Sequence, residues 1–451
     1  MANNRYLSYA PLVLVAAGFL IFKWVPGLPM WIALLFALVG TMVLYSLRRI
    51  PLGELVAGAY KGIARVAAVV AILLIISFLI AVWTKIGVVT AMVHLGISLI
   101  QPWDLPWISF LFTALLSMLL GSSVGTLSAV GPMFIGVAQV FGSPLGVVAG
   151  AAVSGALIGD RSSPISSTVY LMAGMTGTKS SDNYRYITPT LMISAGLTLL
   201  LEVFLSMHQQ NSHVWPLTAS IHLASAAWWW LLLPLGLFFF AILRLPLYLN
   251  FIISIVAAVL MSVLLAHVSL FSILHAAWFG TGLRIYKNST FYAGGIWPTF
   301  DELLLVVFAA ALSGVMERVG AIQAMLLDIG KFCVNEWTSS VVTVIFSLFA
   351  ARLFASQSMS VIMPAQAMNG VFDRLHLPRG KLVRLLSDSG VVVAAIIPWN
   401  LMGAMLSTAV SVRTTTYLPF AFFTYLSPVV TLGYSYLLGK IDKPSSIGES
   451  V

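Results

Sequence analysis

Apolar runs of about 17 to 20 residues recur along the whole chain, and each is long enough to cross the hydrocarbon core of a bilayer. Short polar segments separate them. Two runs, 144–176 and 388–412, contain polar residues, glycine and proline near their middle, which predicts helices that break inside the membrane. The predicted spans are 7–22, 30–47, 66–83, 105–120, 122–142, 144–176, 189–207, 226–243, 250–266, 300–316, 338–354, 356–372, 388–412 and 419–438.

This pattern predicts an all-α polytopic membrane protein with about 11–14 membrane segments. Two further segments have the mixed polar and small-residue character of helices that lie along a membrane surface. They are 53–64, which contains Glu54 and Lys61, and 267–287. We predict interfacial helices at both places.

Composition supports a membrane protein. Of the 451 residues, 60% are hydrophobic and 8% are charged, and the mean hydropathy is +1.01, a balance that excludes a soluble globular protein. The lipid bilayer is therefore a predicted partner. The net charge of +9 does not indicate a nucleic-acid partner, because the basic residues lie in short loops between apolar runs. The single cysteine, Cys333, excludes a disulfide framework.

The loops that carry most of the Lys and Arg alternate along the chain. By the positive-inside rule these loops are cytoplasmic, which places both termini and the tail 439–451 inside. The loop 208–225 has no Lys or Arg and is predicted to be external. The basic residues that mark the cytoplasmic side are Arg48, Arg49, Lys61, Arg65, Lys179, Arg185, Arg244, Arg318, Lys331, Arg374, Arg379, Lys381, Arg384, Lys440 and Lys443.

Two short segments of the first half recur in the second half. Residues 126–132 (TLSAVGP) match 358–364 (SMSVIMP), and 170–175 (YLMAGM) match 400–405 (NLMGAM). The distribution of Lys and Arg in the loops predicts that the two copies cross the membrane in opposite directions. We therefore predict inverted repeats at 1–207 and 226–438, with transport-site segments at 105–176 and 338–412.

The stretch 155–168 (GALIGDRSSPISST) gathers an acid, a base and five hydroxyls around Gly159 and Pro164. Ionisable groups at membrane depth are costly, so this stretch predicts a wet interior site. Asp160 is the strongest candidate, as a carboxylate that binds a cation and a proton in turn. The structural alternative is that Asp160 pairs with Arg161 or with backbone amides.

Hydroxyl and amide groups near the two predicted breaks are further candidate ligands for an ion or a substrate. Serine and threonine also hold membrane helices together, and Asp388 can be a helix cap at the cytoplasmic face. Asn400 follows Pro398, a proline that frees carbonyl groups. Motifs of ATP-driven pumps and hydrolases are absent from the sequence, so we predict no enzyme and no cofactor. The candidates beside Asp160 are Thr126, Ser128, Ser163, Ser166, Tyr170, Ser358, Ser360, Asp388, Trp399 and Asn400.

Several of these motifs resemble the NhaC-type sodium/proton antiporter family. The resemblance extends over roughly 54–438 and is carried by 121–126 (GSSVGT), 159–166 (GDRSSPIS), 397–400 (IPWN) and 417–419 (YLP). It implies a multi-pass transporter of the bacterial inner membrane, coupled to Na⁺ and H⁺, that forms a homodimer by analogy with related folds. Asp160, Ser163 and Asn400 carry over as sodium-site residues.

The chain departs from the family pattern at two places. Ser167 and Tyr170 stand where the family typically has an acid and an amide, and Gln357 stands where an acid often precedes the second hydroxyl motif. Fewer acids mean fewer cation ligands. We therefore expect sodium/proton antiport by alternating access, with coupled transport of an amino acid or a small organic acid as the alternative. In that alternative, Tyr170 and Trp399 line the pocket.

Overall fold

The computed structural model describes residues 10–24, 28–208, 228–286, 289–321 and 332–441. Apart from one antiparallel hairpin, its regular structure is helical, which confirms the predicted all-α class. The elements are α1 (Ala10–Trp24), α2 (Trp31–Ser46), α3 (Leu52–Ile86), α4 (Val88–Leu99), α5 (Leu105–Leu120), α6 (Ser123–Phe141), α7 (Leu145–Ser162), α8 (Ser167–Thr176), α9 (Ser180–His208), α10 (Leu232–Ile242), α11 (Leu247–Leu264), α12 (Leu270–Phe279), β1 (Thr281–Tyr286), β2 (Ser289–Ala293), α13 (Phe300–Arg318), α15 (Glu336–Leu353), α16 (Gln357–Arg374), α17 (Arg379–Leu386), α18 (Leu401–Val410), α19 (Thr414–Tyr417) and α20 (Phe422–Ile441).

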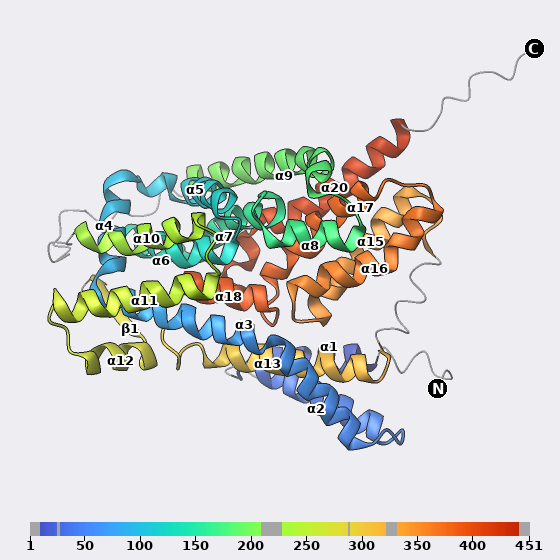
Figure 1. Cartoon of the computed structure of the whole chain (residues 1–451), viewed down its shortest axis with the longest axis horizontal. Helices are drawn as coiled ribbons and strands as arrows, with labels where there is room; N and C mark the ends of the chain where they lie inside the picture. Colours follow the sequence, from blue (N-terminus) through green and yellow to red (C-terminus); the bar gives the residue numbers. More distant parts are fainter. Residues whose placement is uncertain (1–9, 25–27, 209–227, 287–288, 322–331, 442–451) are drawn as a thin grey trace, which may run out of the picture.

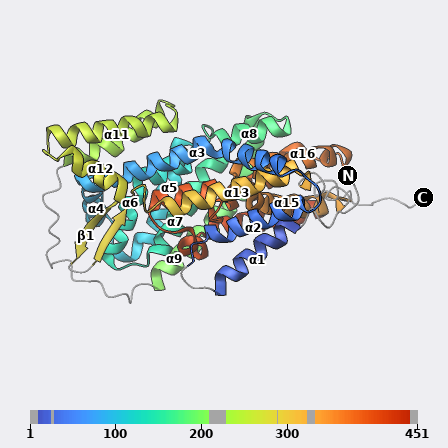
Figure 2. The ribbon, with the colours of Figure 1, turned by 90° about the horizontal axis from the view of Figure 1, so that it is seen from below.

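Most of the long helices lie roughly along the long axis of the molecule (Figures 1 and 2). In the described part of the chain, five helical segments are each long and apolar enough to cross a membrane: Leu52–Ile86, Pro102–Leu120, Ser123–Phe141, Ser180–Met207 and Leu247–Leu264. A sixth is a bent pair, Arg379–Ile396 with Leu401–Val410, whose halves meet at 56°. The chain is a multi-pass membrane protein, and the total of 11–14 segments stays a prediction.

Two sequence-based predictions are wrong in detail, and one helix was missed. Residues 53–64 are not a separate interfacial helix, because α3 continues without interruption to Ile86. Residues 267–287 form a helix only at α12, and β1 then pairs with β2. Helix α4 was not predicted; it follows Gly87, whose φ of 97° ends α3. Most of the loop 208–225 and of the tail 439–451 lies outside the described residues.

The centre of the molecule is built from helices rich in small residues. Helix α18 is buried along its whole length, and α6 and α7 nearly so. Helices α5 and α7 pack closely because α7 presents Gly155 and Gly159, where a Cβ would collide with backbone oxygens of Phe110 and Ser117. Hydroxyls reinforce the contact, since Thr113 donates to the carbonyl of Ala152 at 2.9 Å.

The helices around the two breaks follow the same plan at a constant spacing of 234 residues. Helix α7 corresponds to Arg379–Ile396, and α8 corresponds to α18, with matching first and last residues. The left-handed residues that separate these helices also match: Gly121, Gly142 and Gly177 with Ala355, His376 and Ser411. From the centre, α6 runs toward one end of the molecule and α16 toward the other (Figure 1).

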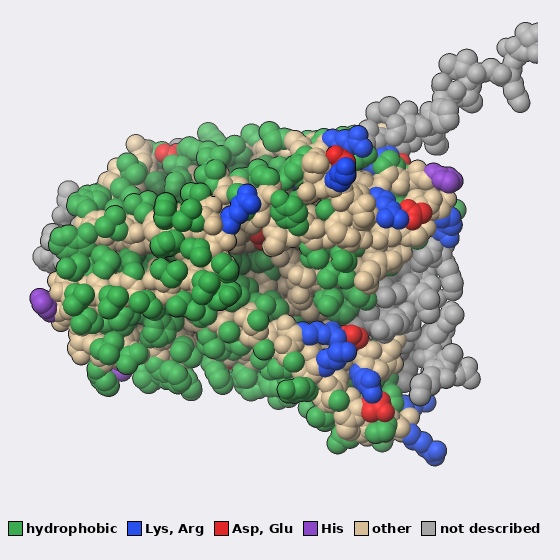
Figure 3. Space-filling model, viewed as in Figure 1, with side chains coloured by type: hydrophobic (Ala, Val, Ile, Leu, Met, Phe, Trp, Pro, Cys, Tyr) green, Lys and Arg blue, Asp and Glu red, His purple; other side chains and the backbone are tan. Residues whose placement is uncertain are grey.

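The basic side chains gather at one end of this surface. Figure 3 shows Lys and Arg concentrated around the ends of α2, α16 and α17, whereas the face over α10, α11 and α12 is mainly hydrophobic. Exposed residues at the basic end include Arg48, Arg49 and Arg374. We call this the basic end of the molecule.

Candidate functional site

The break between α7 and α8 places Asp160 at the centre of the fold. Helix α7 ends at Ser162, and residues 163–166, which include Pro164, are not helical. The Ser163 hydroxyl donates to the carbonyl of Met118 at 2.7 Å, which ties the break to α5. Ser166 caps α8 and donates to the backbone oxygen of Asp160 at 2.8 Å. The break is therefore held in place by its own hydroxyls.

The Asp160 carboxylate lies at the N-terminus of α6. Its two oxygens accept hydrogen bonds from the backbone N–H of Ser123 at 3.0 Å and from the Ser123 hydroxyl at 2.6 Å. The residue is 6% exposed. Free N–H groups and the helix dipole at an N-terminus stabilise a negative charge, so α6 favours the ionised carboxylate.

The first turns of three more helices meet beside this carboxylate. Gln357, the first residue of α16, lies near Asp160, and its amide donates to the carbonyl of Val391 at 3.0 Å. Met402 in α18 lies 3.7 Å from the Ser123 hydroxyl, measured at its sulfur. Helices α6 and α8 from the first half of the chain and α16 and α18 from the second half therefore meet at one point. This convergence is typical of sites built from discontinuous membrane helices.

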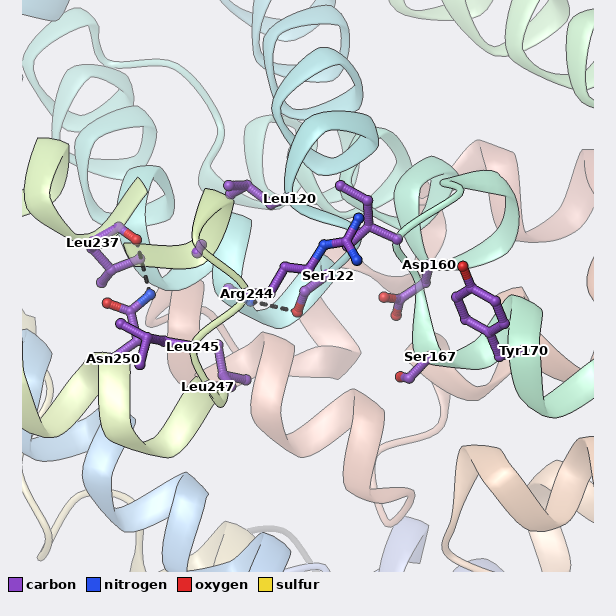
Figure 4. Close-up of a pocket in the computed structure, with 14 residues that line it drawn as sticks. Leu120, Ser122, Asp160, Ser167, Tyr170, Leu237, Arg244, Leu245, Leu247 and Asn250 are labelled. Atoms are coloured by element: carbon purple, nitrogen blue, oxygen red, sulfur yellow. Dashed lines mark hydrogen bonds between the residues drawn. The ribbon is translucent and has the colours of Figure 1, made fainter. Parts of the chain in front are cut away.

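Asp160 also lines a cavity of about 350 Å³. Figure 4 shows Asp160 and Tyr170 on one side and the turn between α10 and α11 on the other. Leu237, Leu245 and Leu247 supply apolar walls. The polar residues in the lining are Ser122, Asp160, Ser167, Tyr170, Arg244 and Asn250.

The second break, at residues 397–400, is built differently. Asn400 is fully buried: its amide donates to the carbonyl of Ala351 at 2.8 Å, and its oxygen caps α18. Trp399 stacks on Phe19, with ring centroids 4.6 Å apart. Pro398 lines a second cavity of about 410 Å³ together with Asp301, Glu302 and Arg413.

Asp388 does not cap a helix at the surface. It is fully buried in a π-helical segment (Ser387–Val391) and accepts a hydrogen bond from the guanidinium of Arg161 at 2.7 Å. Thr190 and Ser427 also donate to it, each at 2.7 Å. Arg161 therefore pairs with Asp388 and not with its neighbour Asp160. This ion pair joins the two halves of the chain.

Comparison with known proteins identifies the family. The sequence model of the Na⁺/H⁺ antiporter family matches residues 4–207 and 155–438, which together span most of the chain. The chain belongs to this family. It is 28% identical over 398 residues to the Na⁺/H⁺ antiporter NhaC of Bacillus subtilis, covering 86% of each chain. It is 26% identical over 449 residues to the NhaC of Alkalihalophilus pseudofirmus, covering 97% of this chain and 95% of the relative.

A third relative has a different named activity. The chain is 26% identical over 395 residues to the arginine/ornithine antiporter ArcD of Halobacterium salinarum, covering 85% of this chain and 81% of the relative. Membership in the family makes the chain a transport protein and not an enzyme. It also implies Na⁺ and H⁺ as the coupling ions and a small ion as substrate.

Not all predicted site residues of this antiporter-family chain lie near Asp160. Ser166 and Ser163 surround the first break, and Tyr170 lines the cavity, with its hydroxyl donating to the Pro164 carbonyl at 3.0 Å. Thr126 is buried and donates within its own helix, and Ser128 is buried with no partner in the described structure. Ser358 is exposed, whereas Ser360 donates to the Gly390 carbonyl at 2.6 Å. Trp399 and Asn400 line neither of the two cavities described above.

The predicted register between the repeats is wrong. The hexapeptide match aligned Tyr170 with Asn400, but Asn400 caps α18 as Ser166 caps α8. Likewise, the 234-residue spacing pairs Thr126 with Ser360 and not with Ser358. Four polar lining residues were missed as site residues: Ser122, Ser167, Asn250 and Arg244, which was interpreted only as a marker of topology.

Proposed function

We propose that the chain exchanges Na⁺ for H⁺ and that Asp160 binds the two ions in turn. The observation that carries the proposal is a buried carboxylate at the meeting point of four helix ends, open to a cavity. Of the described residues that line this cavity, Asp160 is the one carboxylate. Because one carboxylate cannot hold a sodium ion and a proton together, binding of either ion displaces the other.

The surrounding groups suit this exchange. The α6 N-terminus and the Ser123 donors favour the ionised form of Asp160, which is the form that attracts Na⁺. Hydroxyl oxygens and carbonyls freed at the broken helix are the further ligands that sodium needs. Ser163 was predicted as one of these ligands, but its hydroxyl is engaged by the Met118 carbonyl and the Ile165 N–H, and Ser163 does not line the cavity. Asn400 was predicted as another, but its side chain is occupied by α15 and by its own helix, which weighs against it.

The repeats supply a route for alternating access. We propose that 1–207 and 226–438 are inverted repeats, which the matched elements of 121–177 and 355–411 support. The basic end is the cytoplasmic side in this proposal, with both termini there, and the membrane is the bacterial inner membrane. A homodimer stays a proposal from the family resemblance.

Transport measurements on the purified protein test the role of Asp160. In proteoliposomes with a trapped pH dye, Asp160→Asn is expected to reduce sodium-triggered proton movement to the background of empty vesicles. The amide keeps the size of the side chain but can neither release a proton nor carry a charge. Asp182→Asn is the matched control, because Asp182 is exposed at the start of α9, and it should transport normally. Full activity of Asp160→Asn would place the exchange site elsewhere.

A second candidate function is coupled transport of an organic solute. Tyr170, which replaces a small amide of the family pattern, lines the cavity and is 57% exposed. The ArcD relative shows that an amino-acid antiporter is similar to this chain over most of its length. A panel of labelled amino acids and organic acids offered to the same proteoliposomes distinguishes the two functions.

A further inference from the structure

Arg244 occupies an unusual position for a basic loop residue. It lies in the turn between α10 and α11 and adopts a φ of 61°, a left-handed conformation that costs energy for a residue with a Cβ. Figure 4 shows its side chain extending from this turn into the cavity, toward the side where Asp160 lies. In the described structure no side chain forms a hydrogen bond or an ion pair with its guanidinium.

The size of the cavity exceeds what an ion alone requires. A volume of about 350 Å³ equals that of roughly twelve water molecules at ~30 Å³ each. Its lining is also divided, with polar groups at Asp160, Ser122 and Ser167 and apolar walls at Leu237 and Leu247. Pockets for small organic molecules have this combination of apolar walls and a few polar anchors.

The charges of the cavity favour an anionic group. A guanidinium stays protonated at every physiological pH, so Arg244 always contributes a positive charge. A sodium ion that enters alone adds a second positive charge to the one carboxylate of the lining. A solute that carries its own carboxylate restores the balance, since Na⁺ pairs with Asp160 and the carboxylate pairs with Arg244. A dianionic phosphate fits less well, because it faces Asp160 across the same space.

We propose that Arg244 is the anion-binding residue of this cavity and holds the carboxylate of a small organic solute that binds together with the cation at Asp160. The guanidinium offers two parallel N–H donors that match the two oxygens of a carboxylate. Apolar walls then contact the carbon skeleton of the solute. This inference rests on the proposed role of Asp160 as the cation site.

Ligand-induced thermal stabilisation of the full-length protein tests the inference. The protein is reconstituted in phosphatidylcholine nanodiscs with fixed Na⁺ and titrated with lactate, malate, glutamate and arginine. At least one of these carboxylates is expected to raise the Tm in a saturable way. Arg244→Gln should weaken that binding roughly 10- to 100-fold, as loss of a charged hydrogen-bonding pair does. Arg244→Lys should weaken it less, because it keeps the charge but loses the bidentate geometry.

Arg49→Gln is the matched control. Arg49 is also an exposed arginine in the left-handed conformation beside a helix end, with a φ of 67°, but it lines neither cavity. Its carboxylate binding should equal that of the unmodified protein. Absence of binding by all four carboxylates, or equal binding by Arg244→Gln, overturns the inference. A second result also overturns it: no carboxylate raises the Tm, but phosphatidylglycerol added to the nanodiscs does, and Arg244→Gln abolishes that rise. Arg244 is then a lipid anchor.

The inference and the proposed function fail in different ways. Sodium/proton exchange is measured in proteoliposomes that contain no organic carboxylate. If sodium/proton exchange depends on Asp160 but no carboxylate binds, the proposed function is supported and the inference about Arg244 is wrong. If carboxylate binding depends on Arg244 but Asp160→Asn still exchanges sodium for protons normally, the proposed function is wrong instead.

Discussion

At the scale of single residues, Asp160 and Arg161 are neighbours in the sequence but contact different parts of the molecule. Asp160 faces the α6 N-terminus and the cavity, whereas Arg161 turns toward Asp388 in the other repeat. The sequence indicated Asp160 because an acid beside glycine, proline and serines is rare in a membrane segment. It could not reveal the partner of Arg161, because Asp388 lies 227 residues away and no local pattern links the two. The same reason hid the position of Arg244 in the lining of the cavity.

The buried ion pair gives a prediction for stability. Asp388→Asn leaves the Arg161 guanidinium buried without a counter-charge, and removing one partner of a buried pair typically costs about 3–5 kcal/mol. We expect a clearly lower Tm in detergent. The control is Asp373→Asn, an exposed residue whose pKa the Arg379 guanidinium holds below its usual range through hydrogen bonds. The control should unfold close to the normal temperature, and equal losses for both variants would contradict the structural role of Asp388.

At the scale of elements, the spacing of apolar runs predicted most helices and both breaks. It placed α5 at 105–120, as observed, and located the breaks near Pro164 and Pro398. Hydropathy could not separate α4 from the long α3, because only the positive φ of Gly87 divides them. The repeat register failed because short matches in apolar sequence are weak signals. Helix caps and left-handed residues, which recur every 234 residues, are the stronger signals.

Close packing of α5 against α7 gives the prediction at this scale. In Gly159→Ala the new methyl group collides with the backbone of Ser117, so α7 must move away from α5 and take Asp160 with it. Overpacking of this kind costs about 1–3 kcal/mol. We expect a lower Tm and reduced sodium/proton exchange. Gly174→Ala in α8, where a Cβ meets nothing within 4 Å, should change neither measurement.

At the scale of the whole molecule, helices from the two halves of the chain meet head to head around Asp160. The four helix N-termini near this carboxylate belong to elements that diverge toward opposite ends of the molecule. The positive-inside pattern predicted this arrangement, because the loops after α8 and α18 fall on opposite sides. The basic side chains gather at one end of the molecule, which supports the assignment of that end to the cytoplasmic side.

Labelling of single cysteines tests the inverted arrangement. Lys179 and Arg413 are exposed and occupy matching positions at the 234-residue spacing. Each lies two residues after the residue with positive φ that ends a helix. On a Cys333→Ser background, an impermeant thiol reagent added to intact cells should label Arg413→Cys and not Lys179→Cys. Inside-out vesicles should give the reverse. If both positions react from the same side, the repeats are parallel and alternating access through them is ruled out.

The central claim is that sodium and a proton compete for Asp160, and sodium affinity as a function of pH tests it most directly. Radioactive ²²Na⁺ binding to the purified protein is measured across the pH range in the unmodified chain and in Asp160→Asn. Competition for one carboxylate predicts that the apparent Kd for sodium rises about tenfold for each pH unit below the pKa of the site, since each unit raises the proton concentration tenfold. Asp160→Asn should show no such binding. Sodium binding that does not change with pH, or that persists in Asp160→Asn, would contradict the account.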